Sequence, residues 1–272
     1  MKVGIVGKGG TGKTTLSGLI CRAYAARGLR VLAVDTDSNP NLAMSLGLSE
    51  EIASATPVVP RALIVGGGSG QMSPKQVVAD YGLPTPFGVT LLHAMRVDQA
   101  GAGCTCTSHS TVRSLLGAAL EDEADITLVD MEAGLEHLSR SGGTLAYADV
   151  LLMVMEPTVK SILTAARTVP LAQELGIPRV YGVGNKARPG DADFYATVAA
   201  ERGVPLAGVV PFHPSLGEAD RRGEAVPEGA APEVQAAVDG ILELLDSPDE
   251  ERDALLAERA RIDKRIAELR GS

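Results

Sequence analysis

The sequence lacks several features that would place it in other classes of protein. It has only three cysteines, Cys21, Cys104 and Cys106, which excludes the disulfide framework typical of small secreted domains. No apolar run reaches the roughly 18 residues that a membrane span needs. The opening MKVGIVGKGG leads directly into a predicted strand, and we expect no signal peptide. These absences predict a cytoplasmic protein without a membrane partner.

An excess of positive charge is also missing. Lysine and arginine number 25 against 34 aspartates and glutamates, so the net charge is -9 and the pI is near 5.0. Such a chain has no general attraction for the phosphate backbone, on which non-specific DNA binding depends. We therefore expect no nucleic-acid partner, although a local basic patch would escape this sum.

The most informative segment that is present is GKGGTGKTT, residues 7–15, directly behind the apolar run 3–6. It fits the phosphate-binding pattern G-x-x-x-x-G-K-[ST]. A strand that ends in this loop and leads into a helix directs backbone N–H groups at one point. In this pattern Lys13 neutralises the β and γ phosphates, and the Thr14 hydroxyl holds Mg²⁺. The sequence thus predicts an ATP site with these cradle residues: Gly9, Gly10, Thr11, Gly12, Lys13, Thr14 and Thr15. The alternative is a glycine-rich turn with no ligand.

Acidic residues follow two further predicted strands. Asp35 and Asp37 come after strand 30–34, and Asp130 comes after strand 126–129. The carboxyl ends of parallel strands border the ligand crevice, so these carboxylates are placed for Mg²⁺ and its waters and for the attacking water. Gly134 can donate its N–H to the γ-phosphate. Acidic residues in a solvated loop are the alternative for Asp35 and Asp37.

The sequence GAGCTCTSH, residues 101–109, places two thiols at C-x-C spacing ahead of a predicted helix. Cys104 and Cys106 are too close for a relaxed disulfide but can both face one ion. One pair supplies two ligands, and two chains on a symmetry axis would supply four, which completes a tetrahedral site. Taken alone, C-x-C is equally compatible with two unrelated cysteines.

The second lysine of the loop, Lys8, makes KGGTGKT resemble the deviant Walker A ATPases, a class that includes ParA, MinD and the nitrogenase iron protein. The resemblance implies a homodimer around two ATP molecules, with Lys8 reaching the nucleotide of the partner. It also implies that Asp37 polarises the attacking water. Asn185 would contact the adenine edge, and Pro211 would border the base. A surface lysine without this role is the alternative for Lys8.

Three segments together are similar to the family of CooC and AcsF, ATPases that insert nickel into carbon monoxide dehydrogenase and acetyl-CoA synthase. They are KGGTGKT, GAGCTC and DMEAGLEHLSR, the last at residues 130–140. The resemblance runs through most of residues 1–228. It implies Ni²⁺ as the cargo of Cys104 and Cys106 and one of these nickel enzymes as client. Four thiolates suit Zn²⁺ at least as well as Ni²⁺, and only the resemblance to this family indicates nickel. Where the nitrogenase iron protein has a cluster cysteine, this chain has Ala133, which disfavours a bridging iron–sulfur cluster.

The pattern of alternating strands and helices predicts an α/β fold, doubly wound, with a mainly parallel sheet flanked by helices. We expect one P-loop ATPase domain over residues 1–246 and a charged helical extension over 247–272. The expected strands are 3–6, 30–34, 89–93, 126–129, 150–155, 180–184 and 207–210. The expected helices are 14–27, 73–81, 158–175 and 231–245, with one more that carries 219–224.

The sequence therefore predicts an ATP-dependent metallochaperone, a Mg²⁺-dependent ATPase that forms ADP and phosphate. One alternative is a positioning or partition ATPase of the ParA and MinD type, which needs a DNA or membrane surface. Another is a zinc-stabilised dimer scaffold whose cysteines are structural.

Overall fold

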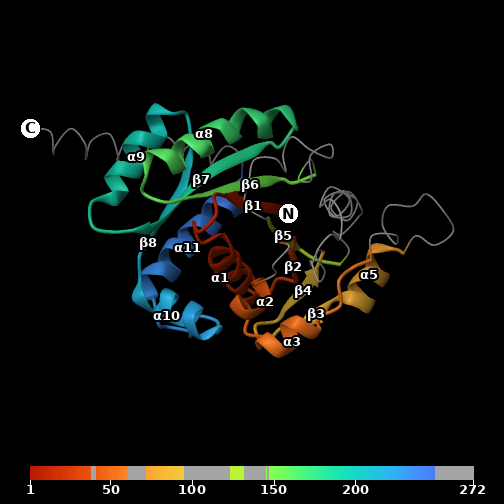
Figure 1. Ribbon diagram of the computed structural model, residues 1–272. Coiled ribbons are helices and arrows are strands. Elements are labelled where there is room, and N and C mark those ends of the chain that lie inside the picture. The colour runs from red at the N-terminus through yellow and green to blue at the C-terminus, as the bar shows by residue number, and fades with distance from the viewer. Residues whose placement is uncertain (38–40, 61–71, 95–122, 132–144, 146, 249–272) are drawn as a thin grey trace, which may run out of the picture.

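The computed structural model describes residues 1–37, 41–60, 72–94, 123–131, 145 and 147–248 (Figure 1). Their strands form one eight-stranded sheet in the order β3-β4-β2-β5-β1-β6-β7-β8. Every pairing is parallel except that of β3 with β4. The strand bounds are β1 Lys2–Gly7, β2 Val31–Asp35, β3 Leu83–Pro84, β4 Val89–His93, β5 Ile126–Asp130, β6 Val150–Met155, β7 Arg179–Ala187 and β8 Leu206–Pro211.

Helices cover both faces of the sheet (Figure 1). On one face lie α1 Lys13–Ala26, α2 Leu42–Ser45, α10 Pro214–Arg222 and α11 Pro232–Asp246. On the other lie α8 Val159–Glu174 and α9 Asp191–Glu201, and α5 Pro74–Tyr81 packs into the same core layer through Val77. The short helix α3 Glu50–Ala55 follows α2. Since no helix in these ranges is both long and apolar enough, none of them is a candidate for crossing a bilayer.

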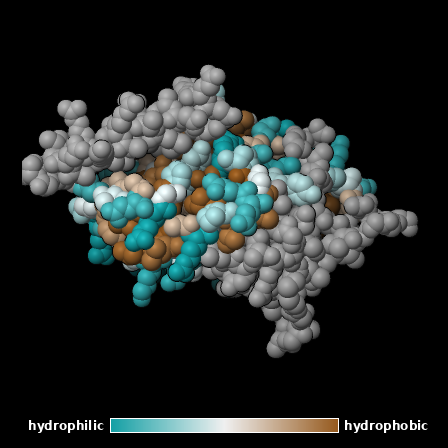
Figure 2. All heavy atoms as spheres, turned by 90° about the horizontal axis from the view of Figure 1, so that it is seen from above, coloured by the Kyte–Doolittle hydropathy of each residue, from teal (hydrophilic) through white to brown (hydrophobic). Residues whose placement is uncertain are grey.

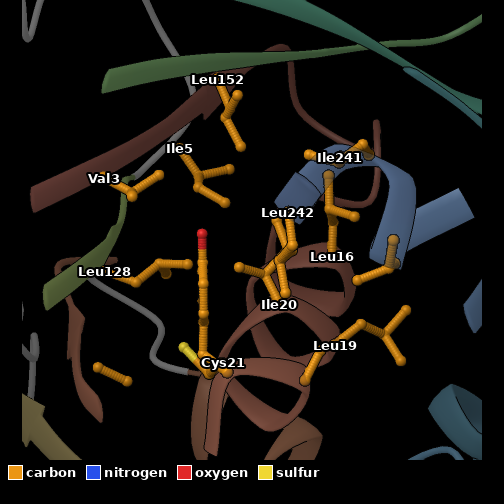
Figure 3. Close-up of a cluster of buried hydrophobic side chains, with 14 of the residues drawn as sticks. Val3, Ile5, Leu16, Leu19, Ile20, Cys21, Leu128, Leu152, Ile241 and Leu242 are labelled. Atoms are coloured by element: carbon orange, nitrogen blue, oxygen red, sulfur yellow. The ribbon is translucent and has the colours of Figure 1, made fainter. Parts of the chain in front are cut away.

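The central strands are apolar on both sides because each side has its own core. In β1, Val3 and Ile5 belong to the core shared with α1 and α11, and Val6 belongs to the core on the α8 side. Figure 3 shows strand side chains directed at Leu16 and Ile20 of α1. Full burial of one such aliphatic side chain contributes roughly 1.5–3 kcal/mol. These two apolar layers hold the strand ends, and therefore the site, in place.

The outer surface of the layer formed by α8 and α9 carries both hydrophobic and hydrophilic residues. Figure 2 looks onto the side that carries α8 and α9, and its coloured area shows hydrophobic residues interspersed with hydrophilic ones. This is the expected surface of amphipathic helices whose apolar stripe faces the sheet.

The doubly wound fold expected from the sequence is confirmed. Each expected strand and helix within the described residues is present with shifts at its ends, but strand 180–184 was predicted too short. β7 continues to Ala187, so Asn185 lies inside the strand and not beyond its tip. The antiparallel β3 and the short helices α2 and α3 were not predicted, because each is too short to show a period. The helix α9 was not predicted either. The helix expected after residues 101–109 lies outside the described residues. Residues 249–272, most of the expected extension, lie outside the described residues.

Candidate active site

The loop after β1 has the conformation that its glycines allow. Gly10 and Gly12 have φ of 81° and 90°, in the left-handed region that side chains disfavour. A Cβ on Gly12 would also overlap the amide nitrogen of Asn185. Gly12 caps α1 without a side-chain bond, and the first turn of α1 holds no acidic residue. The N–H groups at the start of α1 therefore remain available to an anion.

Lys13 is buried and folds back over this loop. Its Nζ donates to the Lys8 carbonyl oxygen at 3.3 Å, and the Thr11 hydroxyl donates to the same oxygen at 2.9 Å. A phosphate oxygen is a stronger partner for an ammonium than a carbonyl, because the bond is then charge-assisted on both sides. Lys13 therefore lies where a bound phosphate would attract it. Lys8, Gly9 and Gly10 are exposed.

The Asp130 side chain contacts the N-terminal half of α1. Its Oδ1 accepts from the Ser17 hydroxyl at 3.1 Å, and its side chain is also hydrogen-bonded to Thr14. Burial raises the pKa of Asp130 to about 6, against the opposing effects of these bonds and of the Lys13 charge. Thr14 and Asp130, each predicted separately to hold Mg²⁺, thus lie next to each other. Ser17 was not predicted, since a serine inside a helix carries no motif.

Asp35 is the register partner of Asp130 on the adjacent strand. Its Oδ1 accepts from the Asp37 N–H at 3.1 Å, and its Oδ2 accepts from the Leu42 N–H at 3.0 Å. Burial first, and then the Asp130 charge, raise the pKa of Asp35 to about 8. Asp35 therefore holds the backbone at Asp37 and at the start of α2, a role that the sequence did not indicate. Asp37 itself is half-buried.

The oxygen ligands at this edge fit Mg²⁺. The Thr14 hydroxyl and the Asp130 carboxylate are adjacent, and Asp35 lies on the next strand. Mg²⁺ prefers one or two carboxylates together with waters and substrate phosphates. The two buried acids repel each other, and a divalent cation would offset that repulsion. Thr14, Asp130 and Asp35 are thus the residues that would hold the ion, directly or through water.

The far side of the loop is held by β7. The Asn185 Nδ2 donates to the Thr11 carbonyl oxygen at 2.7 Å. Lys186 Nζ donates to the Gly10 carbonyl oxygen at 2.5 Å and pairs with Glu156 Oε1 at 2.8 Å. Sequence reasoning did not identify Lys186 or Glu156. A polar Asn-Lys pair at the end of an apolar strand is the signal that would have found the lysine.

The remaining predicted residues fall into two groups. Pro211 ends β8 and is the register partner of Ala187, which places it at the same edge of the sheet as Asn185. Gly134, Cys104 and Cys106 lie outside the described residues. Within the described ranges, no group of three or more histidine, cysteine, aspartate or glutamate side chains is arranged to hold a metal ion.

Known proteins are similar to this chain in sequence or in fold. The carbon monoxide dehydrogenase accessory protein CooC of Rhodospirillum rubrum is 35% identical over 237 residues, which are 82% of this chain and 88% of the relative. An uncharacterised ATP-binding protein of Methanocaldococcus jannaschii is 31% identical over 259 residues, 90% of this chain and 98% of the relative. Among solved structures, the septum site-determining protein MinD of Pyrococcus horikoshii, complexed with Mg-ADP, has a TM-score of 0.70 at 21% identity. That match covers 90% of this chain and 96% of the other.

The domain family described as CobQ/CobB/MinD/ParA nucleotide binding domain matches residues 5–226. That range includes the loop, both buried aspartates and the Asn185–Lys186 pair. This chain therefore belongs to the CobQ/CobB/MinD/ParA family of P-loop ATPases and, within it, to the group of CooC.

Proposed function

We propose that this protein is an ATP-dependent metallochaperone that delivers nickel to an enzyme such as carbon monoxide dehydrogenase or acetyl-CoA synthase. The observation that carries the proposal is the 35% identity to a carbon monoxide dehydrogenase accessory protein over 82% of the chain. Such identity over nearly the whole domain goes beyond the likeness in fold that unrelated P-loop ATPases share. The C-x-C motif supplies the ligands that such a function needs.

The ATPase step depends on positioning and on charge. Lys13 and the N–H groups at the start of α1 bind the phosphates, Asp37 orients and polarises the attacking water, and Asn185 and Pro211 border the base. Mg²⁺ at Thr14, Asp130 and Asp35 supplies neutralisation of the phosphate charge when bound. Lys8 is exposed, as a residue that reaches a partner's nucleotide must be.

The cargo would bind between two chains. Cys104 and Cys106 of each protomer would provide four thiolates around one Ni²⁺, and the same set would accept Zn²⁺. ATP would favour the closed dimer. Metal affinity must then differ between nucleotide states, because otherwise hydrolysis could not drive release.

A positioning ATPase of the MinD type is less well supported. The likeness to MinD is at 21% identity and concerns the fold. The net charge of -9 offers no general attraction to DNA. A zinc-stabilised scaffold differs from the metallochaperone in one measurable respect, since its metal would stay bound through ATP hydrolysis.

The deciding experiment is metal analysis of the protein with ATP, with ADP and without nucleotide, after loading with Ni²⁺ or Zn²⁺. We expect about one ion per two chains, because a tetrahedral thiolate site takes about four ligands. The double variant Cys104→Ser, Cys106→Ser should lose the metal and keep ATP binding. Cys21→Ala is the matched control, because Cys21 is fully buried in the core and burial raises the pKa of its thiol.

Full metal content in the double-serine variant would contradict the proposal. So would one ion per monomer in the unaltered protein, independent of dimerisation. Metal that stays bound after ATP hydrolysis would favour the scaffold.

A further inference from the structure

Lys186 has a backbone conformation that is unfavourable for its residue type. Its φ is 58°, and among the residues that the structure describes it is the only non-glycine with positive φ. Glycine would take this conformation without strain, whereas a lysine is destabilised by its Cβ. Strained residues of this kind cluster at functional sites, where surrounding contacts hold them. The strained backbone of Lys186 therefore indicates that its side chain has a function.

An irregularity in β7 directs two successive side chains at the same loop. Neighbouring residues of a regular strand point to opposite faces of the sheet. Here the register with β8 shifts between Gly184 and Ala187, and both Asn185 and Lys186 donate to carbonyl groups of the phosphate loop. Bulges next to active sites commonly redirect a side chain in this way. The loop is thus held at two consecutive carbonyls, those of Gly10 and Thr11.

The ion pair of Lys186 with Glu156 is not placed to stabilise the fold. The two side chains are 42% and 36% exposed, and ion pairs at such exposure contribute little to stability. Glu156 directly follows β6, so it approaches Lys186 from the adjacent strand. The pair instead orients the Lys186 ammonium group. The Nζ atom of Lys186 lies 2.5 Å from the Gly10 carbonyl oxygen.

We propose that Lys186 is a positioning residue of the nucleotide site and that Glu156 orients it. By holding the Gly10 carbonyl, Lys186 keeps the loop in the conformation in which its N–H groups converge, so less ordering remains for the nucleotide to impose. Because this contact does not involve the γ-phosphate, it favours ADP and ATP equally. The inference rests on the ATP site of the proposed function and is independent of the metal cargo.

The test is ADP binding by Lys186→Met, which keeps most of the side-chain length and removes the donor. ADP binding requires neither hydrolysis nor the metal cargo, so failure of metal delivery would leave this result unaffected. We expect ADP and ATP affinity to fall by about tenfold, as for loss of one hydrogen bond to a charged group. The KM for ATP should rise by about the same factor, with kcat changed less than about twofold, because the lost contact is not specific to the transition state. Lys186→Arg, which keeps the charge and donors, should restore most of the affinity.

Lys186→Gly separates positioning from folding. It removes the side chain and also the backbone strain, so it should be more stable than Lys186→Met and yet bind ADP as weakly. Lys75→Met is the matched control, an exposed lysine on α5, and should bind ADP normally.

The orienting role of Glu156 is tested by combining a Glu156 variant with a Lys186 variant. Glu156→Gln should weaken ADP binding by less than Lys186→Met does. The double variant should bind no more weakly than Lys186→Met alone, because Glu156 acts only by orienting the lysine. Normal ADP affinity in Lys186→Met, normal affinity in Lys186→Gly, or additive effects in the double variant would each overturn the proposal.

Discussion

Two buried aspartates lie side by side on adjacent strands of this site. Asp35 and Asp130 are 0% and 2% exposed and in register. Burial is the main reason for the raised pKa of each, and hydrogen bonds from Leu42, Asp37, Thr14 and Ser17 oppose it. Two such groups destabilise the free protein when both are ionised. The cation that accompanies a nucleotide would relieve this repulsion.

We predict that the free protein loses stability as the pH rises from about 4 to about 8. Each carboxyl has an ordinary pKa of 3.8, raised in the fold to about 8 for Asp35 and about 6 for Asp130. The folded state thus binds more protons across this window, so unfolding becomes easier as they leave. The decrease should be on the order of a few kcal/mol. Urea unfolding at several pH values measures it.

The controls are Asp130→Asn and Mg·ADP. Either should flatten the pH dependence, the first by removing one charge and the second by neutralising the pair. A free energy of unfolding that rises with pH over this window would show that other groups dominate.

Asp37→Asn should bind ATP and accumulate as the ATP-bound form. The amide keeps the shape but cannot polarise water, so we expect kcat to fall on the order of 10²–10⁴-fold. Phosphate release and gel filtration with ATP measure the two effects. Asp35→Asn is not a clean comparison, because the Asp35 carboxylate also accepts two backbone N–H groups. If hydrolysis continues in Asp37→Asn, another residue orients the water.

At the scale of elements, a tyrosine of α9 contacts the C-terminal ends of β6 and β7. The Tyr195 hydroxyl lies 2.9 Å from the Met155 carbonyl oxygen and 2.7 Å from that of Asn185. Its ring packs so closely on Gly184 that a Cβ there would lie 2.8 Å from it. One buried side chain of α9 thus joins the ends of β6 and β7, the strands that carry Glu156 and Lys186 to the loop.

Tyr195→Phe should destabilise the protein by about 1–3 kcal/mol, because two buried carbonyl groups lose this hydroxyl. ADP affinity should fall with it, by less than in Lys186→Met. Urea unfolding and ADP titration measure both. Tyr81→Phe, a half-buried tyrosine at the end of α5, should change stability by less than about 0.5 kcal/mol. Unchanged stability in Tyr195→Phe would mean that these carbonyls find other donors.

At the scale of the whole molecule, the proposed homodimer depends on Lys8. Lys8→Ala should abolish ATP-induced dimerisation and leave ADP binding by the monomer nearly normal. The loop survives this change because its internal bonds use the backbone carbonyl of Lys8, which alanine retains. Lys13→Ala should instead abolish hydrolysis. Sedimentation with ATP measures dimerisation, and a normal ATP dimer in Lys8→Ala would exclude this role.

Much of the fold was predictable from the sequence because its signals are local. Apolar runs followed by glycine or acidic residues mark strand ends, and the loop pattern names Gly12, Lys13 and Thr14 without any coordinates. The capping box of α5 is likewise a local pattern, because Ser73 and Gln76 are three residues apart in the sequence. The prediction of β7 failed at its end because a bulge depends on the partner strand, and one strand's own residues do not encode it.

The sequence by itself determined the class of protein, the doubly wound fold, the phosphate loop and the acidic strand ends, because each depends on residues close together in the chain. Only the tertiary structure decided how distant residues act on one another. It made Asp35 an anchor for Leu42, brought Ser17 to Asp130, and set Lys186 and Glu156 against the Gly10 carbonyl. These contacts join segments whose approach is set by strand order and register, and no local pattern in the sequence specifies either.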